Sequence, residues 1–585
     1  MAEESNFTNQ QVASLLREVV AALTIKKGSI FQIRAYEGAA DAIEHLTSEV
    51  KDLWEEDKLD QIPGVGTNIA KYLEELFQKG KVAHFESIKR GIEPQVFEFL
   101  DITGIGPKTA LELAKLGVKD LKDLTQKIER GELVKKGFSE KIAQKIALSL
   151  KQGSAKTGRM FLPYAASYAQ KILNYLKNCP DIIAVDPLGS LRRQVATIGD
   201  LDFAAASNEP EKVVEYFIKM PGVSRILDSG ENKANIILNS GLEVDLLVGK
   251  PESYGALLQH FTGSKHHNIE LRSLAQKKGI SLSEYGVKDV NTDKLIATKT
   301  EGDLYQILGM DTPEPELREN TGEIEMALKH KLPKLIEFKD IKGDLHLHSS
   351  FPLEPSHDSG ANSIEQIIEY AVKLGYKYVG ISDHSPGFTT HDFFSASKLI
   401  QKRTEYIQKL ASEYKKSIRV LNGLEIDILG DGSLSVANEA LATLDYSIAG
   451  IHSGHRGTKE VITKRILTAL ENPYVDILAH PTGRLLNERP SYEADWEKIF
   501  KFCAKNKKLL EIDAFPNRLD LRDDLVRLAL SFGVSFIINT DAHHIDQMEN
   551  MPFGVSVARR GWAEAKSIVN TWDWKKFAEW FNIKE

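Results

Sequence analysis

Apolar residues recur at intervals of three and four through the first quarter of the chain. Between about residues 10 and 155 this spacing predicts amphipathic helices, as in Val12, Leu15, Leu16, Val19 and Val20. From about residue 182 the pattern changes to short apolar runs that predict strands, at 182–185, 201–205, 234–238 and 242–248. Residues 255–325 return to a mixture of helix and loop.

A second rhythm follows residue 342, where apolar strand-like runs alternate with longer helical runs. The strand-like runs are 378–382, 419–424, 446–450, 475–479, 509–512 and 534–539. Such alternation predicts a parallel α/β sheet or barrel. The segment Met310–Lys342, with three prolines and many Glu and Lys residues, predicts a linker before it.

Length and composition limit the class of protein. At roughly 100–200 residues per domain, 585 residues predict three to five domains. Hydrophobic residues make up 42% and charged residues 27%, as in a globular protein, and no run of apolar residues is long enough to span a membrane. The start of the chain does not resemble a secretory signal. Two distant cysteines, Cys179 and Cys503, offer no disulfide framework, so a reducing compartment, the cytoplasm, is expected.

Charge is distributed unevenly. The net charge of −8 argues against a protein that coats nucleic acid over its whole surface. Residues 105–159 nevertheless carry thirteen Lys and Arg against six Asp and Glu. This excess fits either a solvated face or contact with phosphates.

Two short glycine motifs recur forty residues apart, at 62–67 and 102–107. Each pattern, apolar-x-Gly-apolar-Gly before a helical run, is typical of a helix-hairpin-helix, whose backbone N–H groups can bind a phosphate. One copy could be a plain corner between helices. Two copies beside a basic stretch favour binding to the DNA backbone, with the candidate residues Gly64, Gly66, Gly104, Gly106 and Lys108.

Three carboxylates form a candidate metal site. Asp202 lies on the expected strand at 201–205 and Asp200 directly before it, a spacing of two that puts both on one face of extended chain, and Asp245 lies on the expected strand at 242–248. Carboxylates on one face repel each other unless cations lie between them. Gly189, Ser190 and Arg193 lie just upstream and could hold a phosphate. The set suits Mg²⁺ (or Mn²⁺) and a triphosphate, whereas Asp-x-Asp alone could be an exposed edge strand.

With these motifs, residues 10–325 resemble a family X DNA polymerase. The resemblance extends to His260-Phe261-Thr262-Gly263-Ser264, where the family usually begins with Tyr. It implies that Asp200, Asp202 and Asp245 hold two catalytic metals, that Gly189, Ser190, Arg193 and Gly263 bind the incoming nucleotide, and that Asn268 and Arg272 face the nascent base pair. His260 and Glu243 depart from the family pattern. Tyr72 stands where the eukaryotic branch has the lysine that forms a Schiff base with a 5′-deoxyribose phosphate, and a phenol cannot form that imine.

Histidines concentrate at the other end of the chain, where ten of the sixteen follow Lys342. His346 and His348 share one face of a short strand, and further His, Asp and Glu residues lie where strand-like runs end. The carboxyl ends of strands carry the chemistry in barrels of parallel strands. A donor set without Cys fits Mn, Zn or Fe.

Residues 341–585 resemble the polymerase-and-histidinol-phosphatase (PHP) domain of bacterial family X polymerases, through Gly-Asp-Leu-His-Leu-His, Ser-Asp-His-Ser, Gly-Leu-Glu-Ile-Asp, Ala-His-Pro-Thr-Gly-Arg and Thr-Asp-Ala-His-His. The resemblance implies a distorted barrel, up to three ions of Mn²⁺, Zn²⁺ or Fe²⁺, and hydrolysis at DNA 3′ ends. The implied ligands are His346, His348, Asp358, His384, Glu425, His452, His480, Asp541 and His543. The loop before Asp358 is longer than the family's, so that Ser359 aligns with the ligand position and either Asp358 or His357 could reach the metal.

The expected fold class is therefore multidomain, with α+β and α/β parts. The expected domains are 1–85 and 86–155, each with a helix-hairpin-helix, a nucleotidyltransferase palm at 156–250, a thumb at 251–320, a linker at 321–342 and the PHP domain at 343–585. We expect a monomeric repair polymerase that fills gapped or nicked DNA from dNTPs and trims 3′ ends. The alternatives are a PHP phosphoesterase with a weak polymerase, a DNA-end-binding scaffold and, for the palm alone, a small-molecule nucleotidyltransferase.

Overall fold

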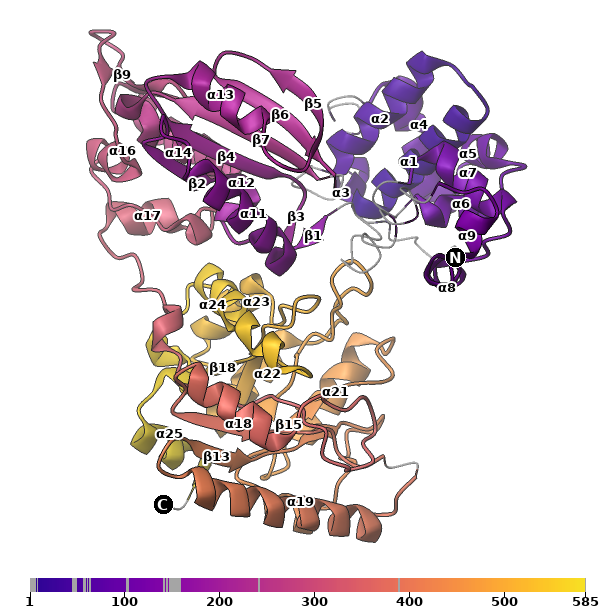
Figure 1. Ribbon diagram of the computed structural model, residues 1–585, viewed down its shortest axis with the longest axis vertical. Helices are drawn as coiled ribbons and strands as arrows, with labels where there is room; N and C mark the ends of the chain where they lie inside the picture. The colour runs from indigo at the N-terminus through magenta and orange to yellow at the C-terminus, as the bar shows by residue number, and fades with distance from the viewer. Residues whose placement is uncertain are drawn as a thin grey trace. The chain divides into compact units, whose positions relative to one another are not determined.

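The computed structural model describes residues 9–44, 50–55, 65–100, 105–139, 159–239, 242–387 and 390–583, with the single residues 7, 59, 62, 143 and 146. The chain divides into two compact units, Met1–Gly158 and Arg159–Glu585. In the described part of the chain, the first unit is helical and all sheets lie in the second (Figure 1). The expected multidomain class of α+β and α/β parts is confirmed.

The first unit consists of short helices around two apolar cores. The helices are α1 (Asn9–Ile25), α2 (Ile30–Glu44), α3 (Val50–Glu55), α4 (Thr67–Lys79), α5 (Ala83–Lys89), α6 (Pro94–Phe99), α7 (Pro107–Lys115), α8 (Leu121–Glu129) and α9 (Glu132–Lys135). Leu16, Leu73 and Phe85 belong to the first core, and Phe99 and Leu113 to the second. Each core contains one of the two helices that follow a glycine motif, α4 and α7.

A five-stranded sheet opens the second unit, with the strand order β2-β4-β7-β6-β5. Its strands are β2 (Ala184–Pro187), β4 (Leu201–Ala206), β5 (Val223–Ser229), β6 (Lys233–Leu238) and β7 (Glu243–Gly249). Strands β4 and β7 are parallel, and the other neighbours are antiparallel. Phe203 and Leu246 pack with α11 (Leu162–Leu176) and α13 (Pro210–Ile218) on one face. Asp202 and Asp245 therefore point to the opposite face.

A smaller body follows the sheet. It comprises α14 (Tyr254–Thr262), α15 (Lys265–Lys277), α16 (Glu301–Ile307), α17 (Glu323–Leu328) and an antiparallel meander of β8 (Ile280–Ser283), β9 (Gly286–Asp289) and β10 (Leu295–Ile296). Leu271, Tyr305 and Ile324 lie in its core. On its other side, α14 packs against Ala204 of the five-stranded sheet.

The C-terminal module is built from two parallel sheets. One contains β11 (Gly343–Asp344), β12 (Tyr378–Ile381) and β13 (Arg419–Asn422), and the other contains β14 (Glu425–Asp427), β15 (Ile448–Gly450), β16 (Ile477–Leu478), β17 (Leu509–Asp513) and β18 (Phe536–Asn539). Single bridges join the two sheets, one from His384 after β12 to Glu425 of β14 and the other from Leu347 after β11 to Ala542 after β18. The strands thus close into a barrel, one of the two arrangements that their alternation with helices predicts and the one that the resemblance to the PHP domain implies.

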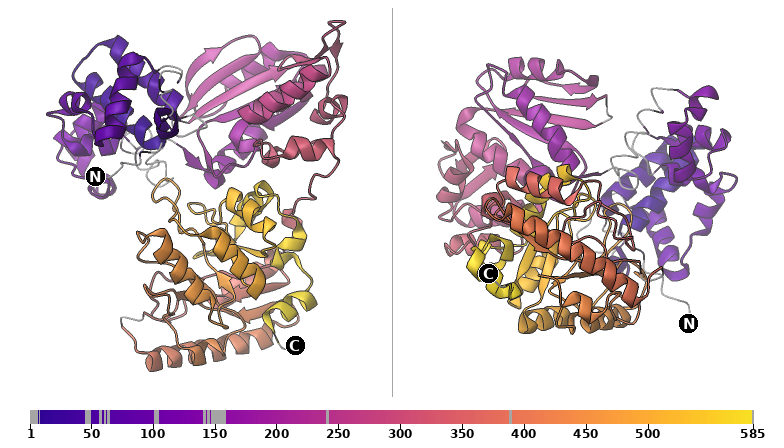
Figure 2. Two further views of the ribbon diagram at one scale, coloured as in Figure 1. Left: turned by 180° about the vertical axis from the view of Figure 1, so that it is seen from behind. Right: turned by 60° about the horizontal axis from the view of Figure 1, so that its bottom comes forward.

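Helices surround this barrel, as the views in Figure 2 show. They include α18 (Ile364–Lys373), α19 (Phe393–Tyr414), α20 (Asn438–Leu441), α21 (Lys459–Leu470), α22 (Trp496–Asn506), α23 (Asp523–Ser531) and α24 (Met551–Arg560). The last helix, α25 (Trp574–Phe581), covers the amino ends of the strands, where Phe577 contacts Tyr378 at a ring distance of 4.2 Å. The carboxyl ends are left for polar side chains.

The segment expected to be a linker, 321–342, is folded against its neighbours. It contains α17 and a 3₁₀ turn at Phe338–Asp340, and another such turn, Pro315–Leu317, precedes it. Next to that turn the Arg318 side chain is 1% exposed and forms an ion pair with Glu301. The segment for which composition predicts a linker therefore contains folded elements, and its charged residues form a buried pair, Glu323 with His267, as well as exposed pairs such as Glu325 with Lys329.

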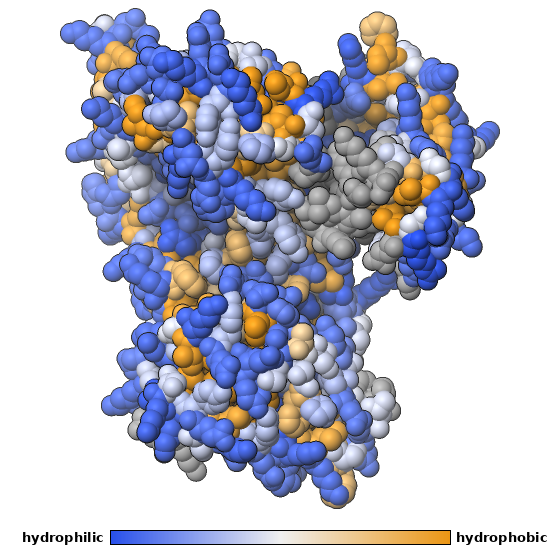
Figure 3. Space-filling model, viewed as in Figure 1, coloured by the Kyte–Doolittle hydropathy of each residue, from blue (hydrophilic) through white to orange (hydrophobic). Residues whose placement is uncertain are grey.

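The face of the molecule in Figure 3 is mainly hydrophilic, with hydrophobic residues scattered over it. In the part of the chain that the structure describes, no helix has the length and apolar character needed to cross a membrane.

Candidate active sites

The five-stranded sheet brings two of the predicted carboxylates together. Asp202 on β4 and Asp245 on β7 are register partners in the parallel pair, and Asp200 lies just before β4. Burial, and then the charges of Asp200, Asp245 and Glu243, raise the pKa of Asp202 to about 7. Burial, followed by the charges of Glu243 and Asp200, raises the pKa of Asp245 to about 6. Such mutual destabilisation of negative charge is typical of a site that holds cations.

Gly189 begins the short helix α12 (Gly189–Arg192) directly beside this site. Its φ is +55°, and a Cβ atom there would lie 3.0 Å from Oδ2 of Asp202. Any side chain at this position would therefore be strained and would crowd the carboxylate. This fits the predicted role of Gly189 and Ser190 as a place where backbone groups approach a phosphate.

Arg193 follows α12, and its guanidinium group is held from two sides. Its Nε donates to Oε1 of Glu319 at 2.9 Å, and its Nη1 donates to the carbonyl oxygen of Thr262 at 2.5 Å. Gly263 lies next to it, since a Cβ on this glycine would be 3.2 Å from the same Nη1. The predicted nucleotide residues Arg193 and Gly263 are thus neighbours.

Asn268 and Arg272 both contact His260, the residue that replaces the family's usual tyrosine. Asn268 Nδ2 donates to the His260 carbonyl oxygen at 2.7 Å, and Arg272 Nη2 donates to His260 Nδ1 at 3.0 Å. Burial lowers the pKa of His260, and Arg272 adds to this effect, while Glu284 opposes it. A neutral imidazole can accept the bond from Arg272, so this departure from the family pattern is integrated into the site.

Next to Arg193 lies a buried ion-pair network that no sequence motif predicts. Arg192 forms a double hydrogen bond with Glu301, at 2.9 and 2.5 Å, and Glu301 also pairs with Arg318. Burial alone would raise the pKa of Glu301, but the charges of Arg318 and Arg192 lower it to about 2. Pairs of residues so distant in sequence carry no local motif.

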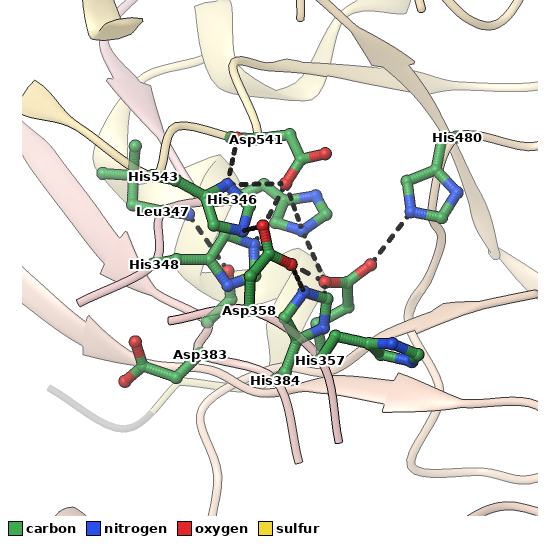
Figure 4. Close-up of polar contacts among 12 residues, drawn as sticks. His346, Leu347, His348, His357, Asp358, Asp383, His384, His480, Asp541 and His543 are labelled. Carbon is green, nitrogen blue, oxygen red and sulfur yellow. Dashed lines mark hydrogen bonds and ion pairs between the residues drawn. The ribbon is translucent and has the colours of Figure 1, made fainter. Parts of the chain in front are cut away.

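In the C-terminal module, the expected ligands gather at the carboxyl ends of the strands. His384 follows β12, Glu425 follows β13 and is the first residue of β14, His452 follows β15 and His480 follows β16. His346 and His348 follow β11, and Asp541 and His543 follow β18. Figure 4 shows His346, His348, His384, Asp541 and His543 in one cluster, with His480 at its side.

Glu425 is the centre of this cluster and is fully buried. Its carboxylate lies 3.1 Å from Nε2 of His346, 2.9 Å from Nδ1 of His384, and 3.0 Å from Nε2 of both His452 and His480. A carboxylate surrounded by four imidazoles can bridge two ions. Among the described residues, four sets place their ligand atoms within 4.8 Å of one another: His346/His348/Glu425/Asp541, His348/His384/His543, His384/Glu425/His452 and His357/Asp427/His452.

The donor atoms of this cluster fit metal ions. Buried atoms without a hydrogen bond include Nε2 of His346, Nδ1 of His348, Oε2 of Glu425 and Nε2 of His543. Unpaired buried polar atoms are unfavourable unless they coordinate an ion or a water molecule. Burial lowers the pKa of His348 to about 3, and the charges of His384 and His543 contribute. The imidazole of His348 is therefore neutral at pH 7, the form that binds metals.

The palm carboxylates are not gathered as tightly. None of the sets within 4.8 Å includes Asp200, Asp202 or Asp245 among the residues that the structure describes. The evidence for a metal site at these carboxylates is the register of β4 and β7 and the raised pKa values of Asp202 and Asp245.

Both candidates on the long loop reach the histidine cluster, at different places. The Asp358 side chain is 77% exposed, and its oxygens lie 3.7 Å from Nε2 of His384 and 3.6 Å from Nε2 of His543 (Figure 4). His357 Nε2 lies 2.9 Å from Oδ1 of Asp427. The same oxygen accepts a hydrogen bond from Nδ1 of His452 at 2.6 Å. The longer loop thus brings both Asp358 and His357 within 4 Å of side chains of the cluster.

Glu511, which the sequence motifs did not single out, forms hydrogen bonds that hold the histidine cluster in place. Glu511 on β17 accepts a hydrogen bond from Nδ1 of His346 at 2.7 Å and another from the His480 backbone N–H, also at 2.7 Å. Such a carboxylate orients a metal-binding imidazole. The Glu-Ile-Asp spacing at 511–513, at the end of a strand, was the sequence signal that could have revealed it.

The second glycine of each hairpin motif starts a helix. Gly66 is the N-cap of α4 and Gly106 the N-cap of α7, and neither has a side-chain cap. A Cβ on either glycine would meet nothing within 4 Å, and Lys108 is exposed. The backbone N–H groups that follow Gly66 at the start of α4, and those that follow Pro107 at the start of α7, can therefore reach an external acceptor. The other candidates, Gly64 and Gly104, lie outside the described residues.

Comparison with known proteins gives matches along most of the chain. Family models match for a helix-hairpin-helix domain at residues 7–82, a SAM-like helix-hairpin-helix tandem at 96–152, a DNA polymerase beta thumb at 257–319 and a PHP domain at 344–514. The chain is 35% identical to the DNA polymerase/3′-5′ exonuclease PolX of Bacillus subtilis (strain 168), over 96% of this chain and 97% of that protein. It is 27% identical to DNA polymerase lambda of Rattus norvegicus, over 48% of this chain and 52% of the other. A probable phosphatase of Caldicellulosiruptor bescii is 28% identical over 31% of this chain and 74% of the other.

Proposed function

The chain belongs to the PolX family of DNA polymerases, and from this premise we propose that it extends DNA at the five-stranded sheet and trims DNA 3′ ends at the histidine cluster. The observation that supports this most is the presence of two separate sets of metal-binding side chains in one chain. One set consists of carboxylates alone and the other mainly of imidazoles. The first suits Mg²⁺ and the second suits Mn²⁺, Zn²⁺ or Fe²⁺.

For the polymerase site, we assign to Asp200, Asp202 and Asp245 the role of holding Mg²⁺ or Mn²⁺. Bound divalent cations would neutralise the charge that develops on the transferred phosphoryl group. Gly189, Ser190, Arg193 and Gly263 would position the triphosphate of a dNTP. Asn268 and Arg272 would lie beside the nascent base pair, with His260 holding both side chains in place.

For the exonuclease site, the ligands would be His346, His348, Asp358, His384, Glu425, His452, His480, Asp541 and His543. Ions held there would polarise a phosphodiester and supply a water-derived nucleophile. Glu511 would keep the ring of His346 in the orientation for binding. We add His357 with Asp427 as a further pair of donors at the rim of the cluster.

The substrate would be gapped or nicked DNA, bound through its backbone. The hairpin glycines and Lys108 offer backbone N–H groups and a cation, which recognise phosphates and not bases. This matches a repair enzyme that fills short gaps of any sequence.

The decisive experiment incubates the purified chain with a one-nucleotide-gapped duplex, with and without dNTPs, in Mg²⁺ and in Mn²⁺. We expect extension with dNTPs and 3′-end shortening without them. Asp202→Asn should lower nucleotide addition about a hundredfold or more and leave shortening intact. His346→Ala with His348→Ala should do the reverse. Loss of both activities in a folded Asp202→Asn protein would contradict the assignment of two sites.

A second candidate, mainly a phosphoesterase with a weak polymerase, is favoured by Glu243. Its charge is among the causes that raise the pKa values of both Asp202 and Asp245. A raised pKa lowers the fraction of each carboxyl group that is ionised near pH 7, and the ionised form is the one that binds metal. Glu243→Gln separates the candidates. A large gain in extension by this variant would identify the natural chain as a weak polymerase.

A further inference from the structure

We propose that Arg560, in the C-terminal module, is a positioning residue for nucleotide binding in the polymerase site. Nη1 of Arg560 donates to the carbonyl oxygen of Arg193 at 2.8 Å and to Oε1 of Glu319 at 3.0 Å. The same Glu319 oxygen accepts the hydrogen bond from Nε of Arg193 at 2.9 Å. This inference rests on the role of Arg193 in triphosphate binding that is proposed above.

Arg560 is itself held rigidly by its own module. Its Nε and Nη2 lie 2.8 and 2.7 Å from Oδ2 of Asp523, the first residue of α23, and its side chain is only 10% exposed. A planar guanidinium bound on both edges has little freedom to reorient. Arg560 therefore holds the backbone of Arg193 directly, and the side chain of Arg193 through Glu319, in a fixed position relative to α23 and α24.

A second contact from the same helix supports this arrangement. Ser556 precedes Arg560 by one helical turn, so both side chains lie on one face of α24. The Ser556 hydroxyl donates to Oε1 of Gln194 at 3.0 Å. The C-terminal module thus contacts two consecutive residues, Arg193 and Gln194, of the segment that would hold the triphosphate.

The chemistry of the Glu319 carboxylate explains why nucleotide binding should depend on Arg560. The Glu319 carboxylate accepts the hydrogen bond from Nε of Arg193. A phosphate of an incoming nucleotide would therefore compete with Glu319 for the Arg193 guanidinium. When Arg193 turns to the phosphate, Glu319 keeps its hydrogen bond to Arg560 and is not left unpaired in a half-buried position. Without Arg560, Glu319 would depend on Arg193 alone and would compete more strongly with the nucleotide.

The test measures single-nucleotide gap filling by the full chain over a range of dNTP concentrations. We expect Arg560→Ala to raise the KM for the dNTP roughly tenfold with a smaller change in kcat, as one charge-assisted hydrogen bond implies. Arg560→Lys, which keeps the charge without the fork, should lie between this variant and the natural chain. Exonuclease activity and metal content should stay unchanged.

Arg559→Ala is the matched control. Arg559 is the neighbour on α24, and its hydrogen bonds run to Glu316 at 2.7 Å and to the Ile336 carbonyl oxygen at 2.9 Å, not to Arg193 or Glu319. An equal rise in KM in Arg559→Ala would overturn the proposal, because it would show a general loosening of the module. An unchanged KM in both Arg560→Ala and Arg560→Lys, with their melting temperatures preserved, would also overturn it.

This outcome can be told apart from a failure of the proposed function. If the natural chain does not extend a gapped duplex, the polymerase assignment fails. If it does, and Arg193→Ala raises the KM while both Arg560 variants leave it unchanged, only the positioning role of Arg560 is refuted.

Discussion

Asp202 and Asp245 face each other as register partners on the parallel strands β4 and β7, and both have a raised pKa. Two strands that run side by side in the same direction force carboxylates at matching positions into proximity. The two carboxylates therefore repel each other at the place where the proposed reaction needs cations.

The first prediction concerns pH and the stability of the metal-free protein. Burial and neighbouring charge raise the pKa of Asp202 to about 7, so its ionised form disfavours the fold, and this penalty grows as the pH rises from about 4 to 7. Asp202→Asn should therefore melt a few degrees above the natural chain in EDTA at pH 8, and the difference should shrink at pH 5. Thermal melts at both pH values test this, and an equal difference at both would contradict it. Mg²⁺ affinity should correspondingly fall below about pH 7.

The second prediction separates the three candidate ligands of the long loop. Asp358 reaches toward His384 and His543, and His357 reaches Asp427. Elemental analysis of the reconstituted full chain should show up to three Mn, Zn or Fe ions attributable to the histidine cluster, beyond any ions at the palm, with at least two of them firmly bound. Asp358→Ala and His357→Ala should each lower the occupancy, whereas Ser359→Ala should not. Full occupancy in Asp358→Ala, or a loss in Ser359→Ala, would show that the loop binds differently.

The third prediction concerns the hairpin glycines. A Cβ at Gly106 meets nothing within 4 Å, so Gly106→Val should fold, yet its side chain would cover the N–H groups at the start of α7. We expect DNA affinity to fall roughly five- to tenfold, about 1 kcal/mol for one hydrogen bond, for any sequence. Binding titrations with two unrelated duplexes measure this. Gly38→Ala, an equally open glycine in α2, is the control, and a loss confined to one duplex would contradict backbone recognition.

The fourth prediction concerns lyase chemistry. Tyr72 stacks on His84 with a ring distance of 4.7 Å and an interplanar angle of 15°, so its place is filled by an aromatic pair and not by an amine. Borohydride should trap little adduct between the chain and a 5′-deoxyribose phosphate end. Efficient trapping would refute this, and its loss in Lys71→Ala would then identify the exposed neighbour as the nucleophile.

The fifth prediction concerns the buried network of Glu301, Arg318 and Arg192. Glu301→Gln leaves the buried Arg318 and the partly buried Arg192 without their counter-charge and should lower the free energy of unfolding by about 3–5 kcal/mol. Because the folded pKa of Glu301 is lowered to about 2, this contribution is complete above about pH 4.5 and is lost as the pH falls toward 2. Urea unfolding at pH 7 measures the loss. Glu325→Gln, which breaks an exposed pair with Lys329, should leave the midpoint unchanged.

The local patterns of the sequence were sufficient to predict the helices and strands and to single out most of the candidate metal ligands. Period-two spacing places His346 and His348 on one face, and the ends of apolar runs mark His384, His452 and His480, because these features depend on residues close together in the chain. The same reasoning identified Asp202 and Asp245 as members of neighbouring strands. It gave no sign that Arg318, in the proline-containing and charged segment 310–342, is buried.

Only the tertiary structure decided which of these side chains meet. Closure of the barrel makes Glu425 the common neighbour of four histidines, brings His357 to Asp427, and leaves Asp358 beside His384 and His543. The contact of Arg560 with Arg193 joins residues that are 367 positions apart. Contacts of this kind depend on how separately formed elements pack, and no local spacing in the sequence encodes that packing.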